Sequence, residues 1–335
     1  MGIEPVRLGI LSTAGINRHL IPPAQASPLV DLVAVASRDA ARASDYASEW
    51  EIGRSYGSYD ALLADGDVEA VYISLPNHEH VPWTLRSLEA GKHVLCEKPL
   101  TRHPAEVETV WGLAESRGLL ACEAFMWRHN PQTKQFAALV DDGAIGELQF
   151  VRSLFSFAMS DPATNVRMKP ELEGGSLMDI GTYCISGIRL LAGEPVAAYG
   201  EQVPGGEGVD VRFGGLLRYE GGVRGLFYSS FETPGRKELE AIGSEGVLRL
   251  LDPWHGWRGG IELQRDEEDR SESIEVESAD AYLLELEDFA RAIRGEKQPL
   301  LGRTDALGQA RALAALYLSA EEGRPVELAE LDREI

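Results

Sequence analysis

The sequence has little cysteine, an excess of acidic over basic residues, and no long apolar run. Its 335 residues include only three cysteines, Cys96, Cys122 and Cys184, and their wide spacing argues against a disulfide framework or a zinc site. The 32 Lys and Arg against 54 Asp and Glu give a net charge of −22, which opposes binding to nucleic acid or to an anionic membrane. No apolar stretch is long enough to cross a bilayer. We therefore expect a reduced, cytoplasmic protein with no metal, no nucleic-acid partner and no membrane.

Apolar runs and helical stretches alternate through the first third of the chain. Short apolar runs at residues 6–11, 29–37, 70–74, 93–96 and 119–123 are typical of buried strands, and helical stretches separate them. Strands joined by helices form parallel sheets through right-handed crossovers. This part of the chain is therefore predicted to be an α/β domain built on a parallel sheet.

The first strand leads into a turn of small residues and then a helix, which is the order found where dinucleotides bind. The three glycine positions of the usual fingerprint fall on Ser12, Ala14 and Asn17. Small residues at the first two still let the backbone approach a pyrophosphate. The second strand ends in Ser37 and Arg38 rather than in an acid, and an arginine can bind a phosphate in a planar fork. We expect NADP in preference to NAD, unless Arg38 only begins the next helix.

An acid, a base and a proline follow the strand at 93–96. Proline pushes the residue before it away from helical dihedral angles, so Lys98 should stand extended at the carboxyl end of this strand. Ligands bind at that end of open α/β sheets. Lys98 is therefore predicted to lie near the chemistry; the alternative is that Glu97 only forms a surface ion pair.

The strand at 70–74 is followed by Leu75-Pro76-Asn77-His78-Glu79-His80. His78 and His80 have the spacing of a metal pair, but no further cluster of ligands accompanies them. We expect cofactor or substrate contacts from this segment, with helix capping as the alternative.

The pattern changes near residue 124. An aromatic and basic connector, Ala124–Gln132, is followed by segments that alternate as strands with short turns, which indicates an antiparallel sheet. Turns are expected at 220–222 and 266–269. We predict residues 1–124 as an NAD(P)-binding Rossmann domain and 125–335 as an α+β substrate-binding and oligomerisation domain with a large open, mainly antiparallel sheet. The predicted strands are 147–157, 196–202, 209–219, 222–231, 238–243, 247–251, 261–264 and 273–276.

A helix predicted over 175–191 carries a second chemical signal. It places Asp179 and Tyr183 at positions i and i+4, on one face. Arg167, just upstream, could reach the same cleft; the alternative is a buried Tyr183 that Asp179 satisfies. The aromatic stretch Trp254–Trp257 could line a substrate cleft, meet a second subunit or simply pack.

The Glu97-Lys98-Pro99 element, the nucleotide unit before it and Asp179-Ile180-Gly181-Thr182-Tyr183 after it together resemble the Gfo/Idh/MocA oxidoreductase family. The resemblance covers nearly the whole chain. Met126-Trp127-Arg128 and the pair Asp179 and Tyr183 look most like the branch that holds dimeric dihydrodiol dehydrogenase and NADP-dependent D-xylose dehydrogenase.

The resemblance implies that Lys98 and Tyr183 are catalytic and that Asp179 lies at the substrate. Tyr183 is the expected general acid/base, and Lys98 supplies a positive charge that favours the phenolate. The residues predicted for substrate are Lys98, Arg128, Asp179 and Tyr183. The residues predicted for the cofactor are Ser12, Thr13, Ala14, Ile16, Ser37, Arg38, Leu75, Pro76, Asn77, His80, Glu97, Lys98 and Arg167.

The expected activity is an NADP-dependent oxidation of a neutral sugar or related diol. A keto-sugar reductase is the nearest alternative, because the same residues serve the reverse reaction. Two further alternatives are a redox-assisted glycosidase that keeps NAD bound and a non-catalytic nucleotide-sensing regulator on the same fold. The resemblance also implies a homodimer or homotetramer that assembles through the open sheet.

Overall fold

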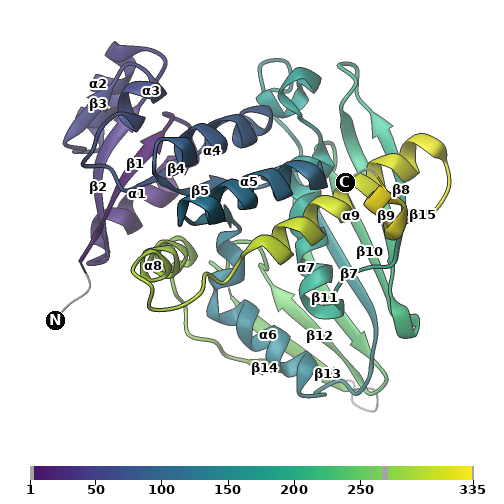
Figure 1. Cartoon of the computed structure of the whole chain (residues 1–335). Helices are drawn as coiled ribbons and strands as arrows, with labels where there is room; N and C mark the ends of the chain where they lie inside the picture. The colour runs from purple at the N-terminus through teal and green to yellow at the C-terminus, as the bar shows by residue number, and fades with distance from the viewer. Residues whose placement is uncertain (1–3, 258, 266–270, 334–335) are drawn as a thin grey trace. The chain divides into compact units, whose positions relative to one another are not determined.

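The computed structural model describes residues 4–257, 259–265 and 271–333 (Figure 1). The chain divides into two compact units. The first unit comprises Met1–Thr101, Ala105–Met126 and Tyr282–Leu307, and the second comprises Arg102–Pro104, Trp127–Ala281 and Gly308–Ile335. Within the described residues, no helix combines the length and the apolar character that a membrane span needs.

The first unit is built on a parallel sheet that, in the described part of the chain, has six strands in the order β3-β2-β1-β4-β5-β6. The strands are β1 (Val6–Leu11), β2 (Val30–Ala36), β3 (Arg54–Tyr56), β4 (Ala70–Ile73), β5 (His93–Glu97) and β6 (Ala121–Ala124). The helices are α1 (Asn17–Ala26), α2 (Ala40–Glu49), α3 (Tyr59–Leu63), α4 (His80–Glu89) and α5 (Pro104–Arg117). The strand order reverses next to β1, and ligands bind at such switch points, at the carboxyl ends of the strands.

The predicted parallel sheet is confirmed, with one strand added. The three-residue strand β3 has no apolar run, and none of its side chains is fully buried, so the sequence pattern did not reveal it. The pattern was clearest where burial is greatest, as in β4, whose four residues are all buried.

The second unit holds a mixed sheet whose described strands run β14-β13-β12-β11-β7-β10-β9-β8-β15. The pair β7 and β10 is parallel, and the other pairs are antiparallel. The strands are β7 (Leu148–Ser156), β8 (Ala197–Pro204), β9 (Asp210–Arg218), β10 (Arg224–Ser230), β11 (Arg236–Gly243), β12 (Gly246–Leu251), β13 (Gly260–Arg265), β14 (Ser271–Ile274) and β15 (Val326–Glu327). The predicted open, mainly antiparallel sheet is confirmed. The turn expected at 220–222 joins β9 to β10, and the one at 266–269 lies outside the described residues.

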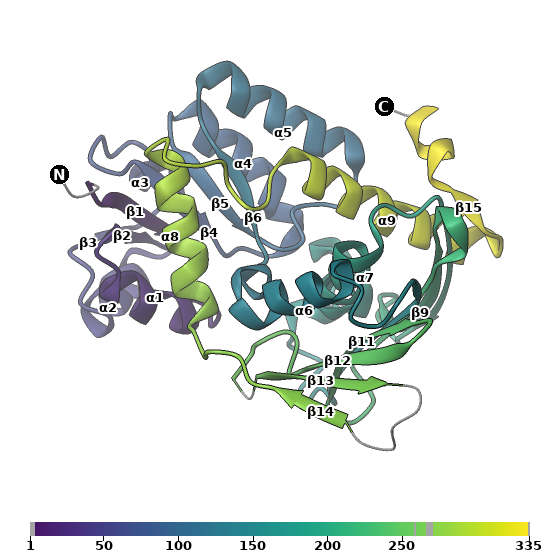
Figure 2. The ribbon, with the colours of Figure 1, turned by 90° about the horizontal axis from the view of Figure 1, so that it is seen from below.

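Helices α6 (Pro131–Asp141) and α7 (Thr182–Ala192) lie against one face of this sheet (Figure 2). A Cβ added to Gly225 of β10 would lie 2.4 Å from Cγ2 of Ile188, so glycine lets α7 pack closely on the strand. α9 (Arg303–Glu322) also contributes to the unit from residue 308 onward. The short helical segments are Asn77–Glu79, Met126–His129, Val166–Met168, Pro170–Leu172, Leu177–Gly181, Glu220–Gly222 and Leu328–Arg333.

The segment Tyr282–Leu307 belongs to the first unit, although a division at residue 124 would assign it to the second. It contains most of α8 (Ala281–Ile293), and Arg294 just after this helix binds Glu69 with both terminal nitrogens at 3.0 and 3.1 Å. Ser27 donates a hydrogen bond to Glu287 of α8 at 3.2 Å. The chain thus returns to the Rossmann-type unit after the second sheet is complete.

Candidate functional site

The turn between β1 and α1 keeps a glycine-type backbone conformation without the first glycine. Ser12 has φ of +137°, which L side chains rarely adopt. Its hydroxyl lies 2.7 Å from Ser74 Oγ and accepts a hydrogen bond from the Ala14 N–H at 3.1 Å. The Asn17 amide donates to the Ser12 carbonyl at 3.0 Å and accepts from the Ser74 hydroxyl at 2.7 Å. This buried hydrogen-bond network fixes the turn in place of a glycine sequence.

The amino end of α1 suits an anion. No side chain of the described structure caps this helix at Ile16, and its first turn contains no acidic residue. A Cβ added to Gly15 would meet no atom within 4 Å, so the space in front of the turn is open. The helix dipole and the amide N–H groups therefore face an accessible position where a phosphate can bind.

Two guanidinium groups lie at the carboxyl end of β2. Buried Ser37 accepts a hydrogen bond from the Asp39 N–H at 3.3 Å, and Asp39 caps α2 by accepting from the Arg42 N–H at 3.0 Å. Burial raises the pKa of Tyr59, while the charges of Arg38 and Arg42 act to lower it. Arg38 and Arg42 therefore lie around the Tyr59 phenol, where a phosphate on the ribose would meet positive charge.

The end of β4 is tied to the segment that follows β5 by a buried histidine. His80 is 1% exposed, and its Nδ1 and Nε2 lie 2.7 Å from the Pro99 carbonyl oxygen and 2.8 Å from the Leu75 carbonyl oxygen. Pro76 and Asn77 lie in the loop that His80 thereby fixes.

Lys98 directly follows β5 and is held from both sides. Its N–H donates to Glu97 Oε2 at 3.3 Å, and the Tyr72 hydroxyl donates to the other carboxylate oxygen of Glu97. Two residues later the Leu100 N–H donates to buried Glu123 at 2.8 Å. Burial, and then the charge of Glu97, raise the pKa of Tyr72 well above that of an ordinary phenol, so Tyr72 is a neutral donor. The lysine is thus fixed at the carboxyl edge of the sheet.

In the second unit, Asp179 lies on a π-helical turn, Leu177–Gly181, which directly precedes α7. The helix predicted over 175–191 is therefore confirmed, and it contains a π-helical turn that the sequence pattern does not reveal. Glycine at Gly175, with φ of +123°, starts the segment, and the wider turn follows it. Arg167 Nε lies 2.5 Å from Asp179 Oδ2. π-Helical turns occur frequently at functional sites.

Tyr183, the second residue of α7, lies among aromatic side chains. Its ring centroid is 5.7 Å from that of Phe155 on β7 and 5.8 Å from that of Trp254. Arg128 donates to Ser186, one turn further along α7, at 3.3 Å. Tyr183, Asp179, Arg128 and Arg167 thus belong to one unit, whereas Lys98 belongs to the other.

After β12, His255 and Trp257 form a partly exposed aromatic pair, called here the aromatic platform, which Lys237 holds in place. His255 and Trp257 lie with ring centroids 4.4 Å apart, and Trp257 is 65% exposed. Lys237 Nζ lies 2.9 Å from His255 Nδ1 and 3.2 Å from Asp252 Oδ1. Phe155 connects this platform to Tyr183, because its centroid is also 6.3 Å from that of His255.

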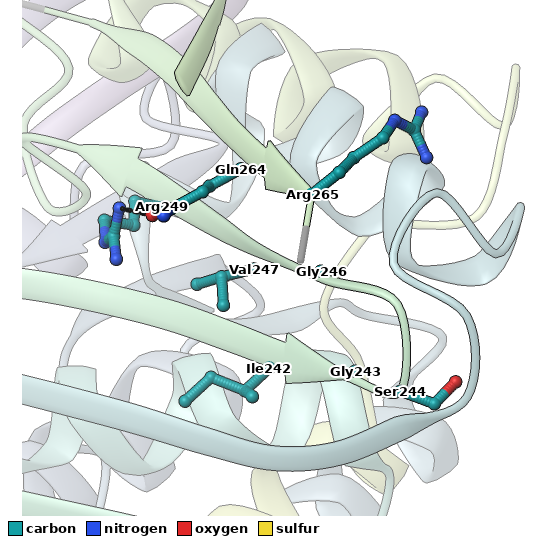
Figure 3. A pocket seen from close by; sticks show the side chains of 8 residues that line it. All are labelled: Ile242, Gly243, Ser244, Gly246, Val247, Arg249, Gln264 and Arg265. Carbon is teal, nitrogen blue, oxygen red and sulfur yellow. Dashed lines mark hydrogen bonds between the residues drawn. The ribbon is translucent and has the colours of Figure 1, made fainter. Parts of the chain in front are cut away.

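A cavity of about 360 Å³ lies elsewhere, over β11, β12 and β13 (Figure 3). Arg249 at this position binds Glu240 at 2.7 Å and Gln264 at 3.2 Å. The cavity contains none of the predicted site residues. Within the described residues, no group of three or more His, Cys, Asp or Glu side chains is placed to hold a metal ion.

Sequence reasoning did not find Ser74, Asp210 or Lys237. Ser74 bonds to Ser12 across 62 residues, and Asp210 bonds to Leu177 across 33. No local pattern marks such residues, because their partners come from other elements. A lone Ser, Asp or Lys in a strand or just beyond its end therefore gives no signal before the sheet is assembled.

Comparisons with known proteins agree with this geometry. The family described as "Oxidoreductase family, NAD-binding Rossmann fold" matches residues 6–125, and the "GFO/IDH/MocA C-terminal domain" matches residues 133–249. D-xylose 1-dehydrogenase (NADP(+)) 2 of Haloferax volcanii is 40% identical over 96% of this chain and 99% of its own length. Trans-1,2-dihydrobenzene-1,2-diol dehydrogenase of Sus scrofa is 34% identical over 74% of this chain and 75% of its own length.

A solved structure shows the same fold along the chain. KijD10, a 3-ketoreductase from Actinomadura kijaniata in complex with NADP and TDP-benzene, superposes with a TM-score of 0.88 at 31% identity. The match covers 94% of this chain and 98% of the other. The two family models match consecutive parts of the sequence, and one relative is 40% identical along nearly the whole chain. The chain belongs to the GFO/IDH/MocA family of oxidoreductases.

Proposed function

We propose that this protein is an NADP-dependent dehydrogenase that oxidises a carbinol carbon of a sugar or a related polyhydroxylated diol. The observation that carries the proposal is Lys98, fixed through Glu97 and Leu100 at the carboxyl end of β5. The relatives that support the class are named as a D-xylose dehydrogenase and a dihydrodiol dehydrogenase.

The residues of the first unit suit a dinucleotide. The turn at Ser12 and the uncapped amino end of α1 would hold the pyrophosphate. Ser37 and Arg38 would bind the ribose phosphate, and this supports NADP over NAD. When bound, the nicotinamide supplies the hydride chemistry. The residues proposed to hold the cofactor are Ser12, Thr13, Ala14, Ile16, Ser37, Arg38, Leu75, Pro76, Asn77, His80, Glu97 and Lys98; Arg167, which the sequence also predicts for the cofactor, is proposed instead to orient Asp179.

Tyr183 and Lys98 are proposed to manage the proton that leaves the substrate hydroxyl. An ordinary phenol, with a pKa of about 10, is a poor base at neutral pH, and a nearby cation stabilises its phenolate. Lys98 would supply this charge and a hydrogen bond to the reacting oxygen. Asp179, oriented by Arg167, would accept hydrogen bonds from other substrate hydroxyls, and Arg128 would bind a further polar group.

The first experiment measures NADP reduction at 340 nm on a panel of aldoses, inositols and diols. NAD is assayed in parallel as the control for cofactor preference. Turnover of a sugar or diol with NADP is the expected result. If no sugar or diol reduces NADP but NADPH reduces keto-sugars, the protein is a ketoreductase and the proposal is replaced. Tight NADP binding without turnover in either direction would favour a nucleotide sensor.

The outer face of the second sheet is proposed to join copies of this chain in a homodimer or homotetramer. Tyr228 lies opposite Leu154 in the register of β10 and β7, and Leu226, 42% exposed, lies opposite Leu216 of β9. Apolar side chains on the open face of a sheet favour a protein partner. Sedimentation should show an oligomer, and Leu226→Lys should weaken it; an unchanged assembly would exclude this face.

A cytoplasmic location is also proposed. Cys96, Cys122 and Cys184 are all buried free thiols, and burial raises the pKa of each above that of an ordinary thiol. Such thiols are typical of a reducing compartment. Cell fractionation would test the location directly.

A further inference from the structure

Asp210 is a buried carboxylate for which the proposed chemistry has no role. It begins β9 and is only 3% exposed. Its Oδ2 accepts hydrogen bonds from the Ser176 hydroxyl and from the Leu177 N–H, both at 2.8 Å. Its Oδ1 accepts from the Tyr317 hydroxyl of α9 at 2.9 Å. One oxygen therefore holds the start of the π-helical turn, while the other holds a separate helix.

The segment that Asp210 holds leads directly to Asp179 and Arg167. The Gly175 N–H donates to the Arg167 carbonyl at 2.8 Å, and the Gly175 carbonyl accepts from the Asp179 N–H at 3.1 Å. Gly175 thus links the backbone of Arg167 to that of Asp179, the two residues whose side chains form an ion pair. A Cβ at Gly175 would lie 2.2 Å from Asp210 Oδ1, and its φ of +123° is itself unfavourable for other residues. Only glycine lets the carboxylate come this close.

The donors around Asp210 require an acceptor. A backbone N–H such as that of Leu177 can only donate, so its partner must present a lone pair. Burial raises the pKa of Asp210 to about 6, and the hydrogen bonds from Leu177, Ser176, Tyr317 and its own backbone act against this rise. Two charged groups lie near Tyr317, the partner of Asp210 Oδ1. Arg102 is 4.7 Å from the Tyr317 ring centroid and acts to lower the pKa of the Tyr317 phenol, and Glu173 acts to raise it. An ionised Asp210 at neutral pH therefore offers the acceptors that the turn needs.

We propose that Asp210 is a positioning residue for the reaction. By binding Ser176 and Leu177 it fixes the π-helical turn, so that Asp179 keeps its pairing with Arg167 and Tyr183 keeps its direction at the start of α7. The reaction itself is the one given under the proposed function, on which this role rests. A displacement of about 1 Å in such a group can cost a hundredfold in rate.

The test compares variants at the two oxygens of one carboxylate. Asp210→Ala removes the acceptor for the turn and should lower kcat for the sugar by at least about tenfold. Tyr317→Phe, the matched control, removes one hydrogen bond from the same carboxylate but leaves both bonds to the turn, so kcat should stay within about twofold. Asp210→Asn keeps one oxygen for the Leu177 N–H and should restore most of the activity. Activity is expressed per NADP-binding site, so that misfolded protein does not count, and the NADP Kd should be the same in all variants.

Two results would overturn the proposal. One is wild-type kcat in Asp210→Ala, and the other is an equal loss in Tyr317→Phe. If Asp210→Ala does not fold, Ser176→Ala removes one hydrogen bond to Oδ2 without a change of charge and should lower kcat in the same direction by less. Unchanged kcat there would likewise refute the role.

A readout independent of activity separates this role from the proposed function. Amide hydrogen exchange in the segment 175–183 should speed up in Asp210→Ala and not in Tyr317→Phe, because only the first variant frees the Leu177 N–H. If the wild-type protein oxidises no sugar, the proposed function fails, while the exchange result still decides whether Asp210 holds the turn. Equal exchange in the wild type and Asp210→Ala would show that it does not.

Discussion

Arg167 Nε lies 2.5 Å from Oδ2 of Asp179, within one unit of the protein. The sequence predicts a cofactor contact for Arg167, and the structure gives its guanidinium a carboxylate partner on the π-helical turn. The Asp179 side chain is 16% exposed and that of Arg167 is 43% exposed, so the carboxylate is the shielded member of the pair. The pair orients Asp179 with a charge that the chain itself supplies.

The effects of an Arg167 substitution on the sugar and on NADP show whether Arg167 orients Asp179 or binds the cofactor. Arg167→Gln should raise the sugar KM by about tenfold, because Asp179 loses a charge-assisted hydrogen bond. The NADP Kd, measured by fluorescence titration, should not change. Arg212→Gln is the control, since Arg212 is an arginine of the same unit that pairs with Glu232 at 3.1 Å. A raised NADP Kd with an unchanged sugar KM would instead support the cofactor contact.

Tyr183→Phe should lower kcat by roughly 10²–10⁴-fold, which is the usual size of general acid–base assistance. The phenyl ring keeps the packing on Phe155 and Trp254, so stability should be retained. Tyr199→Phe is the control, because the Tyr199 hydroxyl donates to Glu201 on the same strand, β8, at 2.8 Å. Steady-state kinetics at 340 nm measure the effect, and undiminished turnover would remove Tyr183 from the mechanism.

Arg38→Glu should reverse the cofactor preference from NADP toward NAD. The substitution replaces a phosphate-binding guanidinium with a carboxylate that repels phosphate and can bond a ribose hydroxyl. The ratio of kcat/KM for the two cofactors is the measured quantity. Arg117→Glu makes the same charge change at the end of α5, in the same unit, and should leave the ratio unaltered. A variant that still prefers NADP would show that Arg38 does not bind the phosphate.

Asp210 should give a distinctive dependence of stability on pH. Its pKa is about 6 in the fold against an ordinary value of 3.8, so the folded state binds the proton more tightly than the unfolded state. The contribution of this group to the free energy of unfolding therefore rises as pH falls through 6 toward 3.8. Relative to Asp210→Asn, the wild type should gain about 2 kcal/mol between pH 7 and pH 4.5, at 1.36 kcal/mol per pKa unit. Urea unfolding of both proteins across this range gives the difference between their free energies of unfolding, in which the contributions of the other carboxylates cancel. A difference that does not change with pH would contradict the prediction.

The sequence by itself determined the parts that depend on local order along the chain. The alternation of apolar runs and helices predicts the parallel sheet, because each strand must be buried on both faces. Likewise, an acid, a base and a proline after an apolar run place Lys98 just beyond the end of β5. The alternating strands after residue 147 predict the second sheet, and the short turns predict its largely antiparallel pairing.

Only the tertiary structure decided how these elements are fixed. The glycine-type turn at Ser12 depends on Ser74, and the π-helical turn at Asp179 depends on Asp210, residues that lie on other strands or just beyond them. The return of residues 282–307 to the first unit likewise depends on Arg294 reaching Glu69. Local patterns record which face of an element is buried, but not which buried polar group meets which. That choice is made when the strands and helices pack, because each buried donor or acceptor must then find a partner.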